Sequence, residues 1–125
     1  MVRKRYIVEF GTGADLHGGD MSKAARRAVK NAISNCCLCG IMEILGLTDP
    51  NRMHVEVKIG CPYPERVDKN EVIQEIPFGT INLELVNGGL EALGLELPAL
   101  GKGNQVVLAI AAVTVYINTE DIKGI

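Results

Sequence analysis

The segment Gly11–Gly18, GTGADLHG, holds the residues best suited to chemistry in this chain. Its glycines let a backbone approach a ligand closely or adopt positive φ, while a carboxylate and an imidazole can bind cations or move protons. If the backbone stays extended from Asp15 to His17, alternation places both side chains on the same side. The segment therefore predicts a site with Asp15 and His17 as catalytic or metal-binding groups and with Gly11, Thr12, Gly13 and Gly18 as ligand contacts.

Asp15 and His17 could begin a site for a divalent metal such as zinc, which requires at least a third protein ligand. The sequence does not choose among the candidates, which are Glu9, Asp20, His54, Cys61 and Glu91. In the alternative interpretation, Asp15 caps a turn or the following helix and His17 hydrogen-bonds backbone in a structural loop. Both interpretations remain open at this point.

Two nucleotide-binding motifs fail on inspection of the same segment. The GxGxxG motif needs a third glycine where Leu16 stands, and a P-loop needs a lysine after Gly18. Phosphate could still meet exposed amides before the helix.

A second candidate is Lys58, because a partly buried lysine beside the strand end at Gly60 can act as a base or an anion clamp; a solvated strand lysine is the alternative.

Hydrophobic spacing predicts the elements that position these residues. A short strand from Arg5 to Phe10 delivers the glycine segment at its C-terminal end. Alanines at helical spacing then predict a helix that is N-capped by Asp20 or Ser22 and continues, with a kink, to Gly46. Further strands are predicted over 53–59, 80–86 and 105–118, with a charged loop over 62–71 and a turn over 87–89. A helix over 80–94 is the alternative to the strand and turn predicted there.

This order of elements predicts an α+β fold, with one long helix on one face of a sheet. One helix cannot cover both faces, so we expect sheets from several copies to pack together in a homo-oligomer. The 125 residues fit a single domain spanning 1–125, which is too short for an enzyme with an interdomain cleft. A site at a subunit interface therefore becomes the expectation.

Composition and charge indicate which classes of partner to exclude and where in the cell the protein is expected. A net charge of −2 provides no field for nucleic acid. No segment approaches the roughly 20 apolar residues of a membrane span, and none has the pattern of a signal peptide, so we expect no membrane partner and a cytoplasmic location. Three of the four cysteines fall within 36–39, where helical geometry disfavours disulfides. With Cys61 they match paired CxxC zinc ligands poorly, so we expect reduced thiols that fill gaps in the core.

The motif GTGADLHG, followed by an alanine-rich helix, resembles an uncharacterised family of bacteria and plants that is defined by GxGxDxHG near the N-terminus. The segments 24–28, 49–50, 54–58 and 61–62 are similar to one repeat of the ring-opening amidohydrolases that act on cyanuric acid and barbiturate. Those enzymes pair such a lysine, here Lys58, with a nucleophilic serine. Glu91 stands at the corresponding position in this chain, a departure that argues against a Ser-Lys pair.

The residues Gly13–His17 also resemble the metal-binding GxDxH of the methylerythritol cyclodiphosphate synthases, and 101–103 resembles their C-terminal region. A third histidine ligand of that family has no equivalent here. Both families imply a trimer, or a multiple of it, of chorismate-mutase-like (YjgF-like) α+β units. The resemblances agree with an enzyme, such as a hydrolase or lyase, that acts on a small polar or anionic molecule at a subunit interface. The alternative is a non-catalytic ligand-binding or assembly protein.

Overall fold

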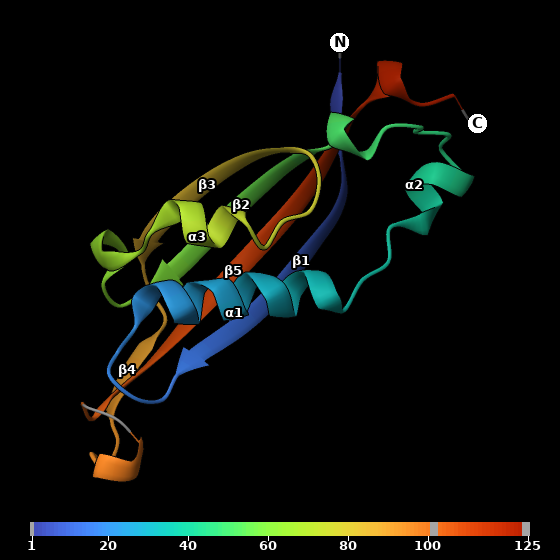
Figure 1. Ribbon diagram of the computed structural model, residues 1–125. Coiled ribbons are helices and arrows are strands. Elements are labelled where there is room, and N and C mark those ends of the chain that lie inside the picture. Colours follow the sequence, from blue (N-terminus) through green and yellow to red (C-terminus); the bar gives the residue numbers. More distant parts are fainter. Residues whose placement is uncertain (1, 101–102, 124–125) are drawn as a thin grey trace.

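The computed structural model describes residues 2–100 and 103–123, which form a mixed α/β fold around one five-stranded sheet (Figure 1). The strand order is β1-β5-β2-β3, and β4 also pairs with β5. These strands are β1 (Arg3–Asp15), β2 (His54–Cys61), β3 (Thr80–Asn87), β4 (Leu90–Leu93) and β5 (Gln105–Asn118). The helices are α1 (Met21–Ser34), α2 (Cys39–Glu43) and α3 (Lys69–Ile73).

The predicted strands are present, and β1 is longer than predicted. Its pairing with β5 continues through the glycine segment as far as Asp15, which lies opposite Val107. The strand predicted over 105–118 matches β5, and β3 ends at Asn87 before a turn that leads into β4. Within the region predicted to be a loop, Asp68 caps the short helix α3, because its side chain accepts a hydrogen bond from the Asn70 amide.

The prediction of one long helix reaching Gly46 is wrong. Helix α1 ends at Ser34, and the chain then leaves its axis before α2 begins at Cys39. The Asn35 side chain donates a hydrogen bond to the Asn31 carbonyl at 2.9 Å, one of the local bonds by which polar residues compete with a helix. Ile41 is instead buried in a second apolar cluster with Leu47 and Val115.

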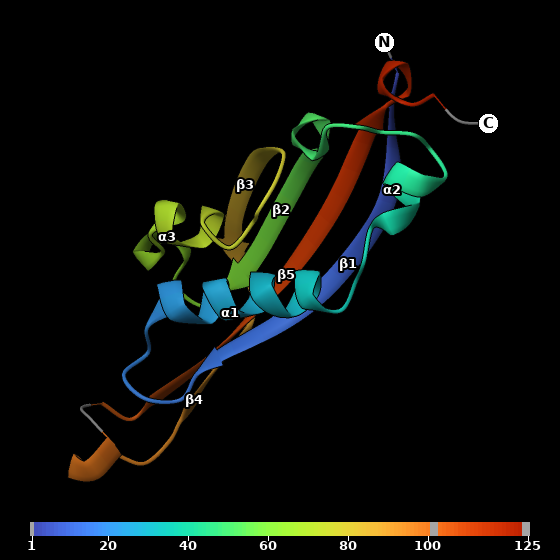
Figure 2. The same ribbon diagram turned by 45° about the vertical axis from the view of Figure 1, so that its right-hand side comes forward.

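The main core lies between the helices and one face of the sheet. Alanines of α1 pack against Val57 and Ile59 of β2 and Val113 of β5. The opposite face carries Val8, Phe10 and Ile110, which are 50%, 70% and 41% exposed. No helix in residues 2–100 and 103–123 lies across this second face, as a rotated view illustrates (Figure 2). We call it the open face of the sheet.

All four cysteines are free, and their burial differs from the prediction. Cys61 is buried in the main core, whereas Cys37 and Cys39 are exposed because the chain has left α1 where they occur. The prediction that they fill gaps in the core is therefore wrong for these two residues. Among the helices of the described residues, none has the length and apolar character needed to cross a membrane.

Candidate functional site

The carboxyl ends of three strands meet at one edge of the sheet. Strands β2 and β3 are parallel, and both β1 and β2 are antiparallel to β5, so β1, β2 and β3 all end at the same edge. Helix α1 begins there, and the segments that follow Asp15, Cys61 and Asn87 leave from it (Figure 1). Ligands of open α/β sheets bind outside the carboxyl ends of strands. We therefore take this carboxyl edge as the candidate site.

Gly11 and Gly13, predicted to contact a ligand, lie directly under α1. A Cβ atom on Gly11 would collide with the backbone of Ala28 and Ala32, and one on Gly13 would collide with the backbone of Ala24 and Ala28. The helix can pack this closely only because both positions lack a side chain. Helix backbone therefore occupies the space over these two glycines.

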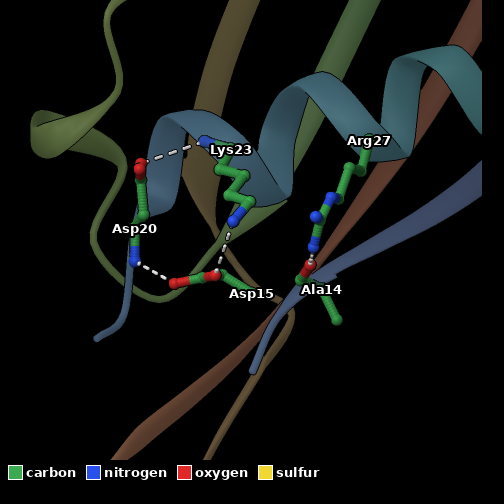
Figure 3. Close-up of polar contacts among 5 residues, drawn as sticks. All are labelled: Ala14, Asp15, Asp20, Lys23 and Arg27. Carbon is green, nitrogen blue, oxygen red and sulfur yellow. Dashed lines mark hydrogen bonds and ion pairs between the residues drawn. The ribbon is translucent and has the colours of Figure 1, made fainter. Parts of the chain in front are cut away.

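Side chains of α1 also bind the outer edge of β1. The Thr12 amide donates to Asn31 Oδ1 at 3.0 Å. Arg27 Nη1 donates to the Ala14 carbonyl at 2.6 Å (Figure 3). Residues four apart lie on the same face of a helix, which lets Arg27 and Asn31 reach the same strand. An edge strand otherwise presents unpaired backbone groups to other chains. These two contacts hold α1 against the edge strand β1.

Asp15 is 3% exposed and sits at the junction of β1 and α1. Its Oδ2 accepts a hydrogen bond from the Asp20 amide at 2.7 Å, and its Oδ1 lies 3.7 Å from Lys23 Nζ (Figure 3). Of the two predicted N-caps, Asp20 and Ser22, the structure has Asp20, whose Oδ1 accepts a hydrogen bond from the Lys23 amide at 3.0 Å. Asp15 thus holds the capping residue, and both of its carboxylate oxygens have protein partners.

His17 does not join Asp15 in a buried site. Strand β1 ends at Asp15, so the alternation expected to align the two residues stops there, and His17 is exposed. Gly18 and Gly19 have φ values of 86° and 65°, which turn the loop back against β5. A Cβ on Gly19 would collide with the Gln105 side chain. Gly18 therefore shapes the loop, and His17 remains on its surface.

A set of polar contacts that the sequence did not predict joins segments at the carboxyl edge. Gln105 Nε2 donates to Glu91 Oε1 at 2.7 Å, and the Tyr63 hydroxyl also donates to Glu91. The hydrogen bond with Glu91 raises the pKa of Tyr63, while bonds from Tyr63 and Gln105 lower the pKa of Glu91. The Arg66 guanidinium lies 4.2 Å from the centre of the Tyr63 ring. Glu91, the one member predicted, therefore belongs to a network that includes Tyr63, Arg66 and Gln105.

The remaining candidates lie elsewhere. Lys58 is on the open face, with Ala112 and Glu84 as its neighbours across the strands, whereas Asp15 faces α1. His54 is at the far end of β2, where its ring contacts Arg3 at 3.2 Å and Asn118 at 3.3 Å. In the described part of the chain, no three His, Cys, Asp or Glu side chains form a group that could hold a metal. Gly101 and Lys102, which resembled a synthase segment, lie outside the described residues.

Comparisons with known proteins identify the family. The model of a family described as "Conserved hypothetical protein (Lin0512_fam)" matches residues 5–115. The chain belongs to this family. The fold of this Lin0512_fam member is similar to a crystal structure from Nostoc punctiforme, described as an FtsZ-like protein of unknown function, with a TM-score of 0.87 and 44% identity. The similarity covers 94% of this chain and 98% of that one. No functionally curated protein matches the chain significantly.

Tyr63→Phe in this Lin0512_fam member is expected to raise the pKa of Glu91 toward its ordinary value, because the Tyr63 hydroxyl is the main cause of the lowered pKa. An NMR titration of the Glu91 carboxyl carbon measures the change, and Tyr116→Phe is the control. A carboxyl whose pKa is lowered in the folded state stabilises the fold at pH values above its ordinary pKa. This stability is lost as the pH falls through the pKa of the folded state. An identical Glu91 titration in Tyr63→Phe would show that the hydroxyl bond does not form in solution.

Proposed function

We propose that the protein is a homo-oligomer, a trimer or a multiple of it, that binds a small polar or anionic molecule at the carboxyl edge. A neighbouring copy completes the site. The observation that carries this proposal is the open face, where Phe10 is 70% exposed beside Val8 and Ile110. A contiguous group of exposed apolar side chains on a sheet is typical of an interaction surface. A second copy supplies the cover that the helices of one chain leave out.

Lys58 and Glu84 share the open face with these apolar residues. Opposite charges on neighbouring strands can fix the register of two packed sheets. The resemblances to ring-opening amidohydrolases and to cyclodiphosphate synthases favour threefold packing of such sheets. This packing would bring Lys58 to the interface between copies, where a role as an anion contact remains part of the proposal.

The polar residues at the carboxyl edge suit a ligand of mixed character. His17 and Arg66 are exposed donors, and Glu91 is an exposed acceptor. His17 and Arg66 would contact a negatively charged group, and Glu91 would contact a hydroxyl or an amide. The two described cavities are lined by other residues. In this proposal, a neighbouring copy encloses the ligand at the carboxyl edge.

Binding without catalysis is the function that the geometry supports best, because Asp15 already holds Asp20 and Lys23. Hydrolase or lyase chemistry stays a prediction, with His17, Lys58 and Glu91 as its remaining candidates for acid-base groups. A divalent metal such as zinc also stays a prediction. It would need ligands from a neighbouring copy in addition to His17, and Asp15 could contribute only by exchanging a present partner.

Phe10→Asp tests the assembly and the site together. The charge on the open face is expected to reduce the mass in solution to the 13.5 kDa of one chain, as measured by light scattering. Inorganic phosphate serves as the anionic probe, and calorimetry is expected to show at least about tenfold weaker binding in Phe10→Asp than in the wild type. Phe10 and Lys58 both lie opposite Ala112 on the open face, so Phe10→Ser, which adds no charge beside Lys58, is measured in parallel. A loss of phosphate binding in a monomeric Phe10→Ser variant would act through the assembly.

Phe10→Leu keeps an apolar side chain on the open face, and Ser34→Asp adds the same single negative charge at an exposed position of α1. Both are expected to retain the wild-type mass and phosphate affinity. A monomeric wild type would contradict the proposed assembly. A monomeric Phe10→Asp variant that binds phosphate as tightly as the wild type would contradict an interface site, and a wild type that binds no phosphate would contradict the anionic ligand.

A further inference from the structure

A cavity of about 410 Å³ lies at the end of the molecule opposite the carboxyl edge. It lies between the end of α1, the segment 36–42 and the residues that precede β2 and β3. This volume falls within the roughly 300–1,000 Å³ of small-molecule sites. The wall is mostly apolar and includes Ile33, Leu38, Met53, Val55, Phe78 and Val113.

Glu9 is the charged residue in this wall. It occupies a position on β1 opposite Val113, which is buried in the main core, so its side chain is on the core-facing side of the sheet. Glu9 is half-buried, and a carboxylate that loses part of its hydration among apolar groups gains from a polar partner there. A core-facing glutamate that lines a cavity is therefore a candidate binding group rather than a packing residue.

The thiol of Cys36 is a partner of Glu9. Burial and the hydrogen bond with Glu9 raise the pKa of Cys36 to about 11, so the thiol stays protonated and donates to the carboxylate. A thiol is a weak donor, and a carboxylate has about four acceptor positions. Glu9 therefore retains acceptor capacity toward the cavity.

We propose that this cavity binds an apolar small molecule that carries a protonated amine. The apolar wall accommodates the hydrocarbon part, and the ammonium group donates a charge-assisted hydrogen bond to Glu9. A ligand with a carboxylate head would place a negative charge against Glu9 in the same apolar surroundings. The site is separate from the one at the carboxyl edge and does not depend on it.

Three probes with the same eight-carbon tail test this assignment: octylamine, 1-octanol and octanoate. Calorimetry on the wild-type protein is expected to show that octylamine binds about tenfold more tightly than octanoate, with 1-octanol between them. Saturating octylamine is expected to slow maleimide modification of Cys37 and Cys39, two exposed thiols that line the cavity. Octanoate at the same concentration is the control, because its weaker binding is expected to leave Cys37 and Cys39 reactive.

Glu9→Gln keeps the shape of the side chain and removes its charge. This substitution is expected to weaken the binding of octylamine about tenfold and to leave the affinity for 1-octanol unchanged. Met42→Trp enlarges an exposed residue of the cavity wall, so it tests the location of the site without altering the core. It is expected to weaken the binding of all three probes. Equal binding of octanoate and octylamine would overturn the proposal. So would an absence of octylamine binding to the folded wild type, or unchanged affinities in Met42→Trp.

Discussion

Gly13→Ala is expected to lower the free energy of unfolding by about 3 kcal/mol or more, as measured by urea denaturation. The added methyl group would collide with the backbone of α1 at Ala24 and Ala28. Backbone atoms cannot rotate away as a flexible side chain can, so the whole helix must move off the sheet. That movement would disturb the packing of Ala24, Ala25 and Ala28, which are fully buried.

Gly60→Ala is the matched control for this substitution. A Cβ on Gly60 would lie 3.4 Å from Gly88 Cα, close to an ordinary contact distance. Both glycines are within strands, and neither has a positive φ, so packing is the main difference between the two changes. We expect Gly60→Ala to change stability by no more than about 0.5 kcal/mol. Equal losses at the two positions would contradict the close packing of α1 on β1.

Asp15→Ala is expected to cost about 2–4 kcal/mol in the same measurement. The substitution removes the acceptor of the Asp20 amide and leaves that donor unsatisfied in a part-buried position. Because Asp20 caps α1, the start of the helix would loosen, which amide hydrogen exchange at Ala24 and Ala25 can detect. Asp15→Asn keeps an oxygen for the Asp20 amide and is expected to cost less.

Lys23→Gln separates the two contacts of Asp15. The Lys23 side chain is 41% exposed, so its ion pair with Asp15 is screened by water and contributes at most about 1 kcal/mol. A small loss in Lys23→Gln beside a large loss in Asp15→Ala would assign the stability to the amide hydrogen bond. If Asp15→Ala were as stable as the wild type but lost a bound metal, the metal-ligand hypothesis would replace the structural role.

Local patterns in the sequence were enough to predict much of the fold. Alternation of apolar residues located β2 and β3, because a strand that buries one face repeats every two residues, and a long β-branched run located β5. The spacing of the alanines located α1, and Asp20 was a recognisable N-cap. The extent of the helix was not predicted, since its apolar spacing continues through Ile41 although the chain leaves the axis of α1.

The candidate site shows what the sequence by itself could and could not determine. The sequence determined which segments carry glycine, carboxylate and imidazole groups, because residue type is local information. Only the tertiary structure decided that α1 packs directly on Gly13 and that Asp15 accepts a hydrogen bond from the N-cap residue Asp20. It also placed Lys58 on the other face of the sheet. It also joined Tyr63, Glu91 and Gln105 and placed Glu9 in a separate cavity. Such contacts link residues far apart in the chain, so they depend on how the strands and helix pack, which no local pattern records.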